Sequence, residues 1–180
     1  MKHYFMTPDA TAAISAPVAG TVTRLDDDFV GKQVWITSDL QPAFTFIIFH
    51  INLAKPLVLG ERIAEGQNLG THIGRQTFSD IAVGVNTPTP GASWRLVSYF
   101  DTLTDAAFAA YQARGIATRG QFIFSKAERD ADPYQCSTSD VPALFTKLKV
   151  QPDVEYVDLS GAQRIATTVP PAVMYVSDTP

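Results

Sequence analysis

The sequence predicts a mainly β protein with a C-terminal extension that contains one or two short helices. From residue 14 to residue 100, short apolar segments alternate with clusters of Asp, Gly, Pro and Ser, and helical periodicity is almost absent. After residue 101, N-cap residues precede an alanine-rich segment, which is typical of a helix. We therefore expect a β-rich domain at residues 1–100 and a helix-containing extension at residues 101–180 that packs on it.

The expected strands of the first domain are short and end at turn-forming residues. They cover residues 20–25, 33–37, 44–52, 62–63, 68–73, 81–85 and 94–99. The segment from Phe44 to Phe49 is apolar on both faces apart from Thr45. A strand with one face in water would alternate, so this segment predicts a central strand that is covered on each side.

In the extension, the clearest helix covers residues 106–114. Thr104 and Asp105 are N-cap candidates, and Gly115 ends the segment. Phe108 and Tyr111 give the helix an apolar stripe. Beyond it we expect a short strand at residues 121–125, an exposed charged segment at 126–132, a short amphipathic helix at 142–150, and a strand pair at 154–159 and 172–176.

The composition is that of an ordinary globular protein and limits the classes of partner. The chain has 180 residues, 46% hydrophobic and 18% charged, and its net charge of −4 comes without a Lys/Arg cluster. Nucleic acids and anionic membranes need several convergent cations, so we expect neither as a partner. The longest apolar run is far shorter than the roughly 20 residues of a membrane-spanning helix, so no transmembrane segment is expected. One cysteine and three histidines cannot build a four-thiolate zinc site or an internal disulfide.

Three segments of the first domain carry glycines or a histidine at spacings that indicate a compact barrel. Residues 14–22 read ISAPVAGTV, residues 46–52 read FIIFHIN, and residues 59–70 read LGERIAEGQNLG. Glycines in such strings mark corners where the backbone needs a positive φ or a close approach. Together, over about residues 3–85, these segments resemble the lysostaphin-type (LytM-like) zinc endopeptidases of peptidoglycan and their non-catalytic relatives.

This resemblance implies a barrel-sandwich hybrid, the duplicated hybrid motif of that family. Biotinyl and lipoyl domains and the glucose-type phosphotransferase domain share the glycine corners, so the glycine string indicates fold more than function. His50, after an apolar strand, favours the peptidase-like branch. The family also implies a bacterial envelope location, periplasmic, secreted or lipid-anchored, although residues 1–15 show no signal-peptide pattern.

Peptidoglycan-cutting members of the family bind zinc through an H-x-x-x-D motif and the second histidine of an H-x-H motif. On this chain, the resemblance places His3 at the first ligand and Thr7 at the second, with Asp9 two residues beyond. Asp80 and Ala82 occupy the H-x-H positions. Alanine cannot coordinate zinc, and a catalytic zinc normally keeps three protein ligands. We therefore expect a degenerate site without a bound cofactor, and an enzyme only as the alternative.

The candidate site residues each have a functional and a structural interpretation. His50 and Asp80 could form a ligand-binding or catalytic remnant, or His50 could be a buried histidine tied to backbone or to Asp80. His3, His50 and Asp80 could together hold a relocated metal, because two imidazoles and a carboxylate are an acceptable ligand set. Arg129 could clamp a ligand carboxylate, or belong to a solvated charged face. Cys136 has no histidine nearby in sequence and is expected to be a bystander thiol.

Aromatic side chains are numerous enough to line a sugar-stacking groove or to fill the core. The candidates are Trp35, Phe44, Phe46, Phe49, Trp94, Tyr99 and Phe100. Strand aromatics more often fill cores, so the core is the favoured interpretation and the groove is the alternative. The third histidine, His72, has no counterpart in the zinc motifs and is expected to be structural.

The leading hypothesis is a catalytically inactive, peptidase-like domain that binds a cell-envelope ligand, such as peptidoglycan or a peptide, or an envelope protein. The preserved glycine framework with a lost metal set motivates it. The alternative is a divergent metal-dependent hydrolase of peptide or peptidoglycan, with its metal at His3, His50 and Asp80. A carrier of the lipoyl kind is the third possibility, and the lack of a lysine at a hairpin tip between matched apolar strands counts against it.

Overall fold

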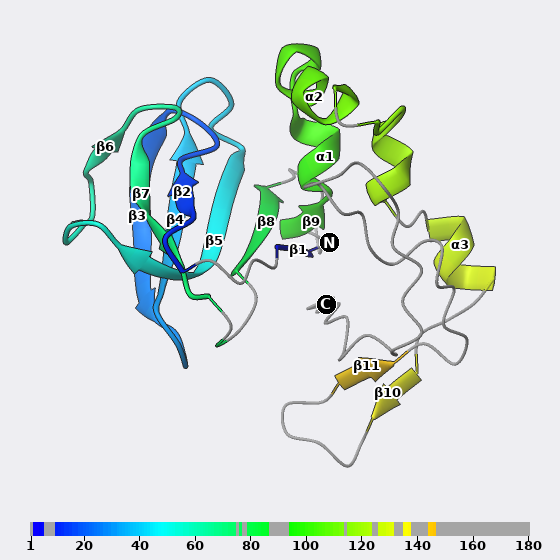
Figure 1. The fold of residues 1–180 in the computed structure, drawn as a ribbon, viewed down its shortest axis with the longest axis horizontal. Coiled ribbons are helices and arrows are strands. Elements are labelled where there is room, and N and C mark those ends of the chain that lie inside the picture. Colours follow the sequence, from blue (N-terminus) through cyan, green and yellow to red (C-terminus); the bar gives the residue numbers. More distant parts are fainter. Residues whose placement is uncertain are drawn as a thin grey trace. The chain divides into compact units, whose positions relative to one another are not determined.

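The computed structural model describes residues 2–5, 10–74, 76, 79–86, 94–113, 115–123, 126–131, 135–137 and 144–146. The chain divides into two compact units, Met1–Tyr99 and Phe100–Pro180. The first unit contains the strands of a large sheet, and the second contains α2, α3 and a short strand pair (Figure 1).

The first unit is mainly β, as predicted. Its strands are β1 (Lys2–Phe5), β2 (Ala13–Ser15), β3 (Gly20–Asp27), β4 (Lys32–Ser38), β5 (Phe44–Leu53), β6 (Arg62–Ile63), β7 (Asn68–His72), β8 (Ser79–Asn86) and β9 (Trp94–Val97). Each of the seven strands expected in residues 1–100 is present, with its ends shifted by two residues at most. β2 lies at the start of the segment at residues 14–22, whereas β1 is not among the expected strands.

One antiparallel sheet joins these strands along an open path. The order is β1-β8-β5-β4-β3-β6, while β7 pairs with β5 and β2, and β9 pairs with β8. β1 and β6 end this path, so the hydrogen bonding among the described strands does not close into a barrel. β5 has β4 along one edge and β8 followed by β7 along the other, which confirms the predicted central strand. Figure 1 shows β3, β4 and β5 running side by side.

The sheet has an inner face, which forms the core, and an outer face. The buried residues of the core form one apolar cluster of Ala16, Val22, Val34, Ile36, Phe46, Ile48, Ile51, Leu57, Ile63, Leu69, Ile81 and Val83. Successive side chains of a strand point to opposite faces, so Ile47, Phe49 and Asp80 belong to the outer face. The register pairs Ile47 with both Trp35 and Ala82, which therefore lie on the outer face too.

Glycines at residues 59–70 have the backbone requirements that the sequence predicts. Gly60 and Gly66 have φ values of 84° and 75°, in the left-handed region. At Gly70, a Cβ would overlap the Asn52 carbonyl group, so only glycine lets β7 approach β5 this closely. The glycines of this segment therefore fix the path by which the chain returns to the sheet.

The second unit is built from short elements. They are α1 (Tyr99–Thr102), which begins at the last residue of the first unit, α2 (Asp105–Gln112), the 3-10 helix η1 (Arg119–Phe122), α3 (Lys126–Ala131), β10 (Gln135–Ser137) and β11 (Leu144–Thr146). α2 confirms the helix expected at residues 106–114, and the Thr104 hydroxyl caps it by accepting from the Ala107 N–H at 3.1 Å. Phe108 of α2 is buried and stacks beside Tyr111. No helix in the described residues is long and apolar enough to cross a membrane.

Two local predictions in the second unit are wrong. The strand expected at residues 121–125 overlaps η1, where Phe122 stacks on Phe100 with the ring centroids 4.0 Å apart. The helix expected at residues 142–150 contains β11, which pairs with β10. In both places, contacts between segments that are separated in sequence override the local pattern. The strand pair expected at residues 154–159 and 172–176 lies outside the described residues.

Candidate functional site

Two tryptophans stack on the outer face of the sheet. The rings of Trp35 on β4 and Trp94 on β9 have centroids 6.2 Å apart and planes at 22°. Trp94 lies directly over Gly84, where a Cβ would overlap its ring. The guanidinium carbon of Arg24 lies 4.8 Å from the centroid of the Trp35 ring, in cation–π contact. Both tryptophans are partly exposed, so the stacked pair offers apolar surface to solvent.

A β-bulge in β5 determines where His50 points. The register between β4 and β5 shifts by one residue between Ile48 and Ile51, so Phe49 and His50 lie opposite a single residue of β4. His50 has a φ of 55°, and among the described residues no other non-glycine has a positive φ. A left-handed residue is uncommon for an L side chain, and bulges of this kind re-aim side chains next to functional sites.

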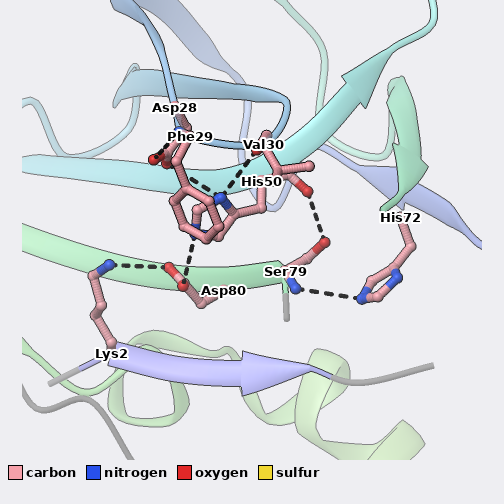
Figure 2. A network of polar contacts seen from close by, with 8 residues as sticks. All are labelled: Lys2, Asp28, Phe29, Val30, His50, His72, Ser79 and Asp80. Carbon is pink, nitrogen blue, oxygen red and sulfur yellow. Dashed lines mark hydrogen bonds and ion pairs between the residues drawn. The ribbon is translucent and has the colours of Figure 1, made fainter. Parts of the chain in front are cut away.

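The imidazole of His50 donates at one nitrogen and can accept at the other. Nδ1 lies 3.0 Å from the Val30 carbonyl oxygen, which only accepts, so Nδ1 carries the proton of the neutral ring (Figure 2). Asp28 Oδ2 lies 3.4 Å from the same nitrogen, and the Phe29 ring meets the imidazole edge-on at 4.7 Å. In the neutral ring Nε2 keeps a lone pair, whereas a protonated ring presents a second N–H there. Nε2 lies 3.9 Å from Asp80 Oδ2, which is too long for a direct hydrogen bond.

Asp80 is a buried carboxylate on β8, between β5 and β1. Its side chain is 3% exposed, and Lys2 of β1 reaches it with Nζ 3.3 Å from Oδ1. The same ammonium lies 3.4 Å from the centroid of the Phe49 ring. Burial raises the pKa of the Asp80 carboxyl to about 6, although Lys2 and His50 act in the opposite direction. The effect of burial on the pKa of Asp80 is therefore only partly offset by Lys2 and His50.

His3 lies on the inner face, away from His50 and Asp80. It pairs with Ile81, whose side chain belongs to the core cluster. His3 Nε2 lies 2.9 Å from Ser98 Oγ, and burial lowers the pKa of the imidazole to about 4. The structure thus brings His50 and Asp80 together and places His3 on the opposite face. Within the described ranges, no group of three or more His, Cys, Asp or Glu side chains is placed to hold a metal ion.

Backbone groups surround His72. Its Nδ1 lies 2.8 Å from the Gly74 amide nitrogen, and its Nε2 lies 3.3 Å from the Ser79 amide nitrogen. The Ser79 hydroxyl in turn donates to the His50 carbonyl oxygen at 2.9 Å. These contacts link the ends of β7 and β8 to the bulge of β5, in keeping with a structural role for His72.

Several of the predicted positions contribute no described polar group to this site. Ala82 is 1% exposed and follows Asp80 by two residues on the outer face. Arg129 lies in α3 and Cys136 in β10, and both side chains lie outside the described part of the structure. Thr7 lies outside it as well, as does the neighbouring Asp9.

The aromatic candidates divide among three places. Phe46 belongs to the core cluster, and Phe44 and Tyr99 pack against that cluster. Phe100 packs within the second unit. Trp35, Phe49 and Trp94 lie on the outer face and are partly exposed. The sequence therefore identifies the aromatic residues of the outer face, but it does not distinguish them from the aromatic residues that fill the core.

Lys2 and Phe29 contact the candidate residues but are not among the positions that the sequence predicts. Lys2 enters through the register of β1 on β8, for which the sequence carries no local signal. Phe29 lies in the turn between β3 and β4 and is 76% exposed. A large aromatic residue directly after Asp26, Asp27 and Asp28 is the signal that could have identified it.

Searches by sequence find no matching protein family and no matching curated protein. Two solved structures resemble part of the chain. One is a proposed glycyl-glycine endopeptidase, LytM, from Ruminococcus gnavus, with a TM-score of 0.39 and 17% identity over 51% of this chain and 41% of that one. The other is CbpA from L. salivarius, with a TM-score of 0.34 and 16% identity over 47% of this chain and 61% of that one. Both matches span less than two thirds of the other protein, and at these TM-scores they establish neither a family nor an activity.

Proposed function

We propose that this chain is a catalytically inactive, peptidase-like domain that binds a cell-wall ligand, glycan or peptide, in the bacterial envelope. The observation that carries the proposal is the outer face of the sheet. There the partly exposed rings of Trp35, Trp94 and Phe49 lie on the same face as the buried carboxylate of Asp80. An apolar surface with a polar group beside it suits a ligand that has both sugar or aliphatic faces and charged groups.

Each part of this face has a chemical role in the proposal. The stacked tryptophans offer ring faces on which the C–H face of a sugar or an aliphatic stem packs. Arg24 lies over one of these rings with its Nε paired to Asp26 Oδ2 at 2.7 Å, and the terminal N–H groups of its guanidinium would contact a ligand carboxylate.

The donor set of this face does not fit a catalytic zinc ion. Such an ion needs three protein ligands around one point, and within the described residues no three His, Cys, Asp or Glu side chains are placed in that way, although Asp28 and Asp80 both lie near His50. Ala82 offers no donor at the position that the sequence resemblance assigns to an essential ligand. His3 would have to leave Ser98 and cross the sheet to join them. These features support an inactive domain over the divergent hydrolase.

Retention on purified peptidoglycan tests the binding function. Trp35→Ala and Trp94→Ala should each reduce retention about fivefold, the scale of one aromatic contact. Leu40→Ala is the matched control, because Leu40 is 85% exposed and lies in the turn after β4, away from the tryptophan pair. Melting curves establish that each variant is folded. Retention of the wild-type protein no greater than that of an unrelated acidic protein would refute the proposal.

Release of soluble fragments from dye-labelled peptidoglycan tests catalytic silence. The expected result is no release above buffer, with or without added zinc. Turnover that zinc stimulates and that His50→Ala abolishes would overturn the inactive assignment and support a metal-dependent hydrolase instead.

A further inference from the structure

The ammonium group of Lys2 is held on the outer face much as a ligand is held. It lies 3.3 Å from the Asp80 carboxylate and 3.4 Å from the centre of the Phe49 ring (Figure 2). A carboxylate and an aromatic face are the two groups that proteins combine to recognise a primary ammonium ion. The Lys2 side chain is 18% exposed, whereas Asp80 is 3% exposed, so the cation lies between the buried acid and solvent.

The site contains more potential hydrogen-bond acceptors than the Lys2 ammonium group contacts. The proton on His50 Nδ1 is directed at the Val30 carbonyl oxygen, which leaves Nε2 as an acceptor. When the imidazole is neutral, Nε2 and Asp80 Oδ2 are two acceptors that lie 3.9 Å apart. One N–H-bearing group placed between them would contact both at ordinary hydrogen-bond distances. Lys2 approaches the other carboxylate oxygen, Oδ1.

Lys2 can leave this site without a change in the sheet. Its contacts there are one ion pair and one cation–π contact, both made by a flexible four-carbon side chain. β1 is also held by its backbone pairing with β8, in which the side chain takes no part. Rotation of the side chain would expose Asp80 and Phe49 to a second ammonium group. The burial that raises the pKa of Asp80 also means that the carboxylate gains from any cation beside it.

We propose that Asp80, Phe49 and His50 form a binding site for a primary ammonium group of a peptide, and that Lys2 occupies this site as an internal competitor. The proposal rests on the proposed function in taking the ligand from a cell-wall peptide. A lysine-type side-chain amine and a peptide α-amine share this chemistry. Competition by Lys2 would favour ligands that also contact the tryptophan pair, because a lone amine must displace it.

Small amine probes test the site without peptidoglycan. The probes are Nα-acetyl-lysine N-methylamide for a side-chain amine, glycylglycine amide for an α-amine, and Nα,Nε-diacetyl-lysine N-methylamide as the uncharged control. Affinity is measured by titration on the full chain near neutral pH, with wild type, Lys2→Ala and Lys2→Met. Lys2→Ala vacates the site, whereas Lys2→Met removes the charge and keeps the space filled.

Lys2→Ala should bind one of the two amine probes about tenfold more tightly than wild type, the scale of one charge-assisted hydrogen bond. Lys2→Met should show no such gain, and adding Asp80→Asn to Lys2→Ala should abolish it. The diacetylated probe should bind none of the proteins. Binding of the diacetylated probe to Lys2→Ala as tight as that of the better amine probe, or no gain for either amine probe in Lys2→Ala, would overturn the ammonium site.

Peptidoglycan retention separates this inference from the proposed function. Retention that depends on the tryptophans, together with no amine binding in Lys2→Ala, overturns the ammonium site alone. Amine binding in Lys2→Ala together with no peptidoglycan retention supports the site and overturns the cell-wall function. If acetylation of the lysines in the stem peptides lowers retention of the wild-type protein, the result supports both the ammonium site and the cell-wall function.

Discussion

Replacing Asp80 with asparagine should stabilise the protein at neutral pH, although it removes a charged group with a cationic neighbour. Burial raises the pKa of the Asp80 carboxyl from 3.8 to about 6. The folded protein therefore binds this proton more tightly than the unfolded chain, and folding takes up a proton between these pH values. Stability accordingly falls as the pH rises through this range. The accumulated loss is about 3 kcal/mol by pH 7, at about 1.4 kcal/mol for each pH unit.

His3 has the opposite effect over nearly the same range. Burial lowers the pKa of its imidazole from 6.5 to about 4. The unfolded chain takes up this proton first on acidification, so stability falls as the pH drops through this range, again by about 3 kcal/mol in total. In the wild-type protein the two contributions oppose each other between about pH 4 and pH 6 and largely cancel.

Urea denaturation followed by tryptophan fluorescence between pH 4 and pH 7.5 measures both effects. The difference in unfolding free energy between Asp80→Asn and wild type should be near zero at pH 4 and rise to as much as about 3 kcal/mol at pH 7. An unpaired Lys2 ammonium would reduce this gain. The difference cancels the contributions of all other titrating groups, because they are common to both proteins.

The matched control is His3→Gln, which should give the mirror image. Its stability relative to wild type should be highest near pH 4, because the glutamine does not acquire a buried charge there. A difference between Asp80→Asn and wild type that does not change with pH would refute the reasoning. So would an Asp80→Asn protein that is less stable than wild type at pH 7, since the ion pair with Lys2 would then outweigh burial.

Two further pairs of variants test the backbone around the site. His50→Ala should be less stable than His50→Gly by about 1 kcal/mol in urea denaturation, because residue 50 has a φ of 55° and only glycine adopts it without strain; an alanine variant as stable as the glycine one would contradict the strained bulge. Gly70→Ala should cost about 3 kcal/mol or more, because its Cβ meets the Asn52 carbonyl group, whereas Gly66→Ala should cost about 1 kcal/mol from its φ of 75° alone, with no atom within 4 Å of the new Cβ. Equal melting temperatures for these two glycine variants would show that β7 can move away from β5.

The strands were predictable because their signals are local. Apolar alternation and turn residues define β3 to β9 within a few residues, and the apolar segment that begins at Phe44 identifies the central strand. The glycine string at residues 59–70 likewise carries its own conformational requirement. β11 was not predictable in this way, since Leu144 and Phe145 fit an amphipathic helix as well as a strand, and the pairing with β10 decides between them.

The site itself depends on register, which the sequence does not display. β1 pairs with β8 so that His3 lies opposite Ile81 and faces the core. A slip of one residue would exchange the faces of β1 and place His3 on the same side as Asp80. The same dependence hides Lys2, which reaches Asp80 only because β1 lies along that edge. The stack of Trp35 on Trp94 joins β4 to β9 across two intervening strands, so no local pattern in the sequence indicates it.

The β-bulge means that the pairing of β5 with its neighbours does not require His50. Ile48 and Ile51 both face the core, and Phe49 alone would separate them in a regular strand. A strand with one residue fewer would keep the same inward sequence of side chains and avoid a left-handed residue. The inserted residue His50 therefore does not change which side chains of β5 face the core. What the bulge does is direct the imidazole of His50 to the Val30 carbonyl oxygen on one side and toward Asp80 on the other.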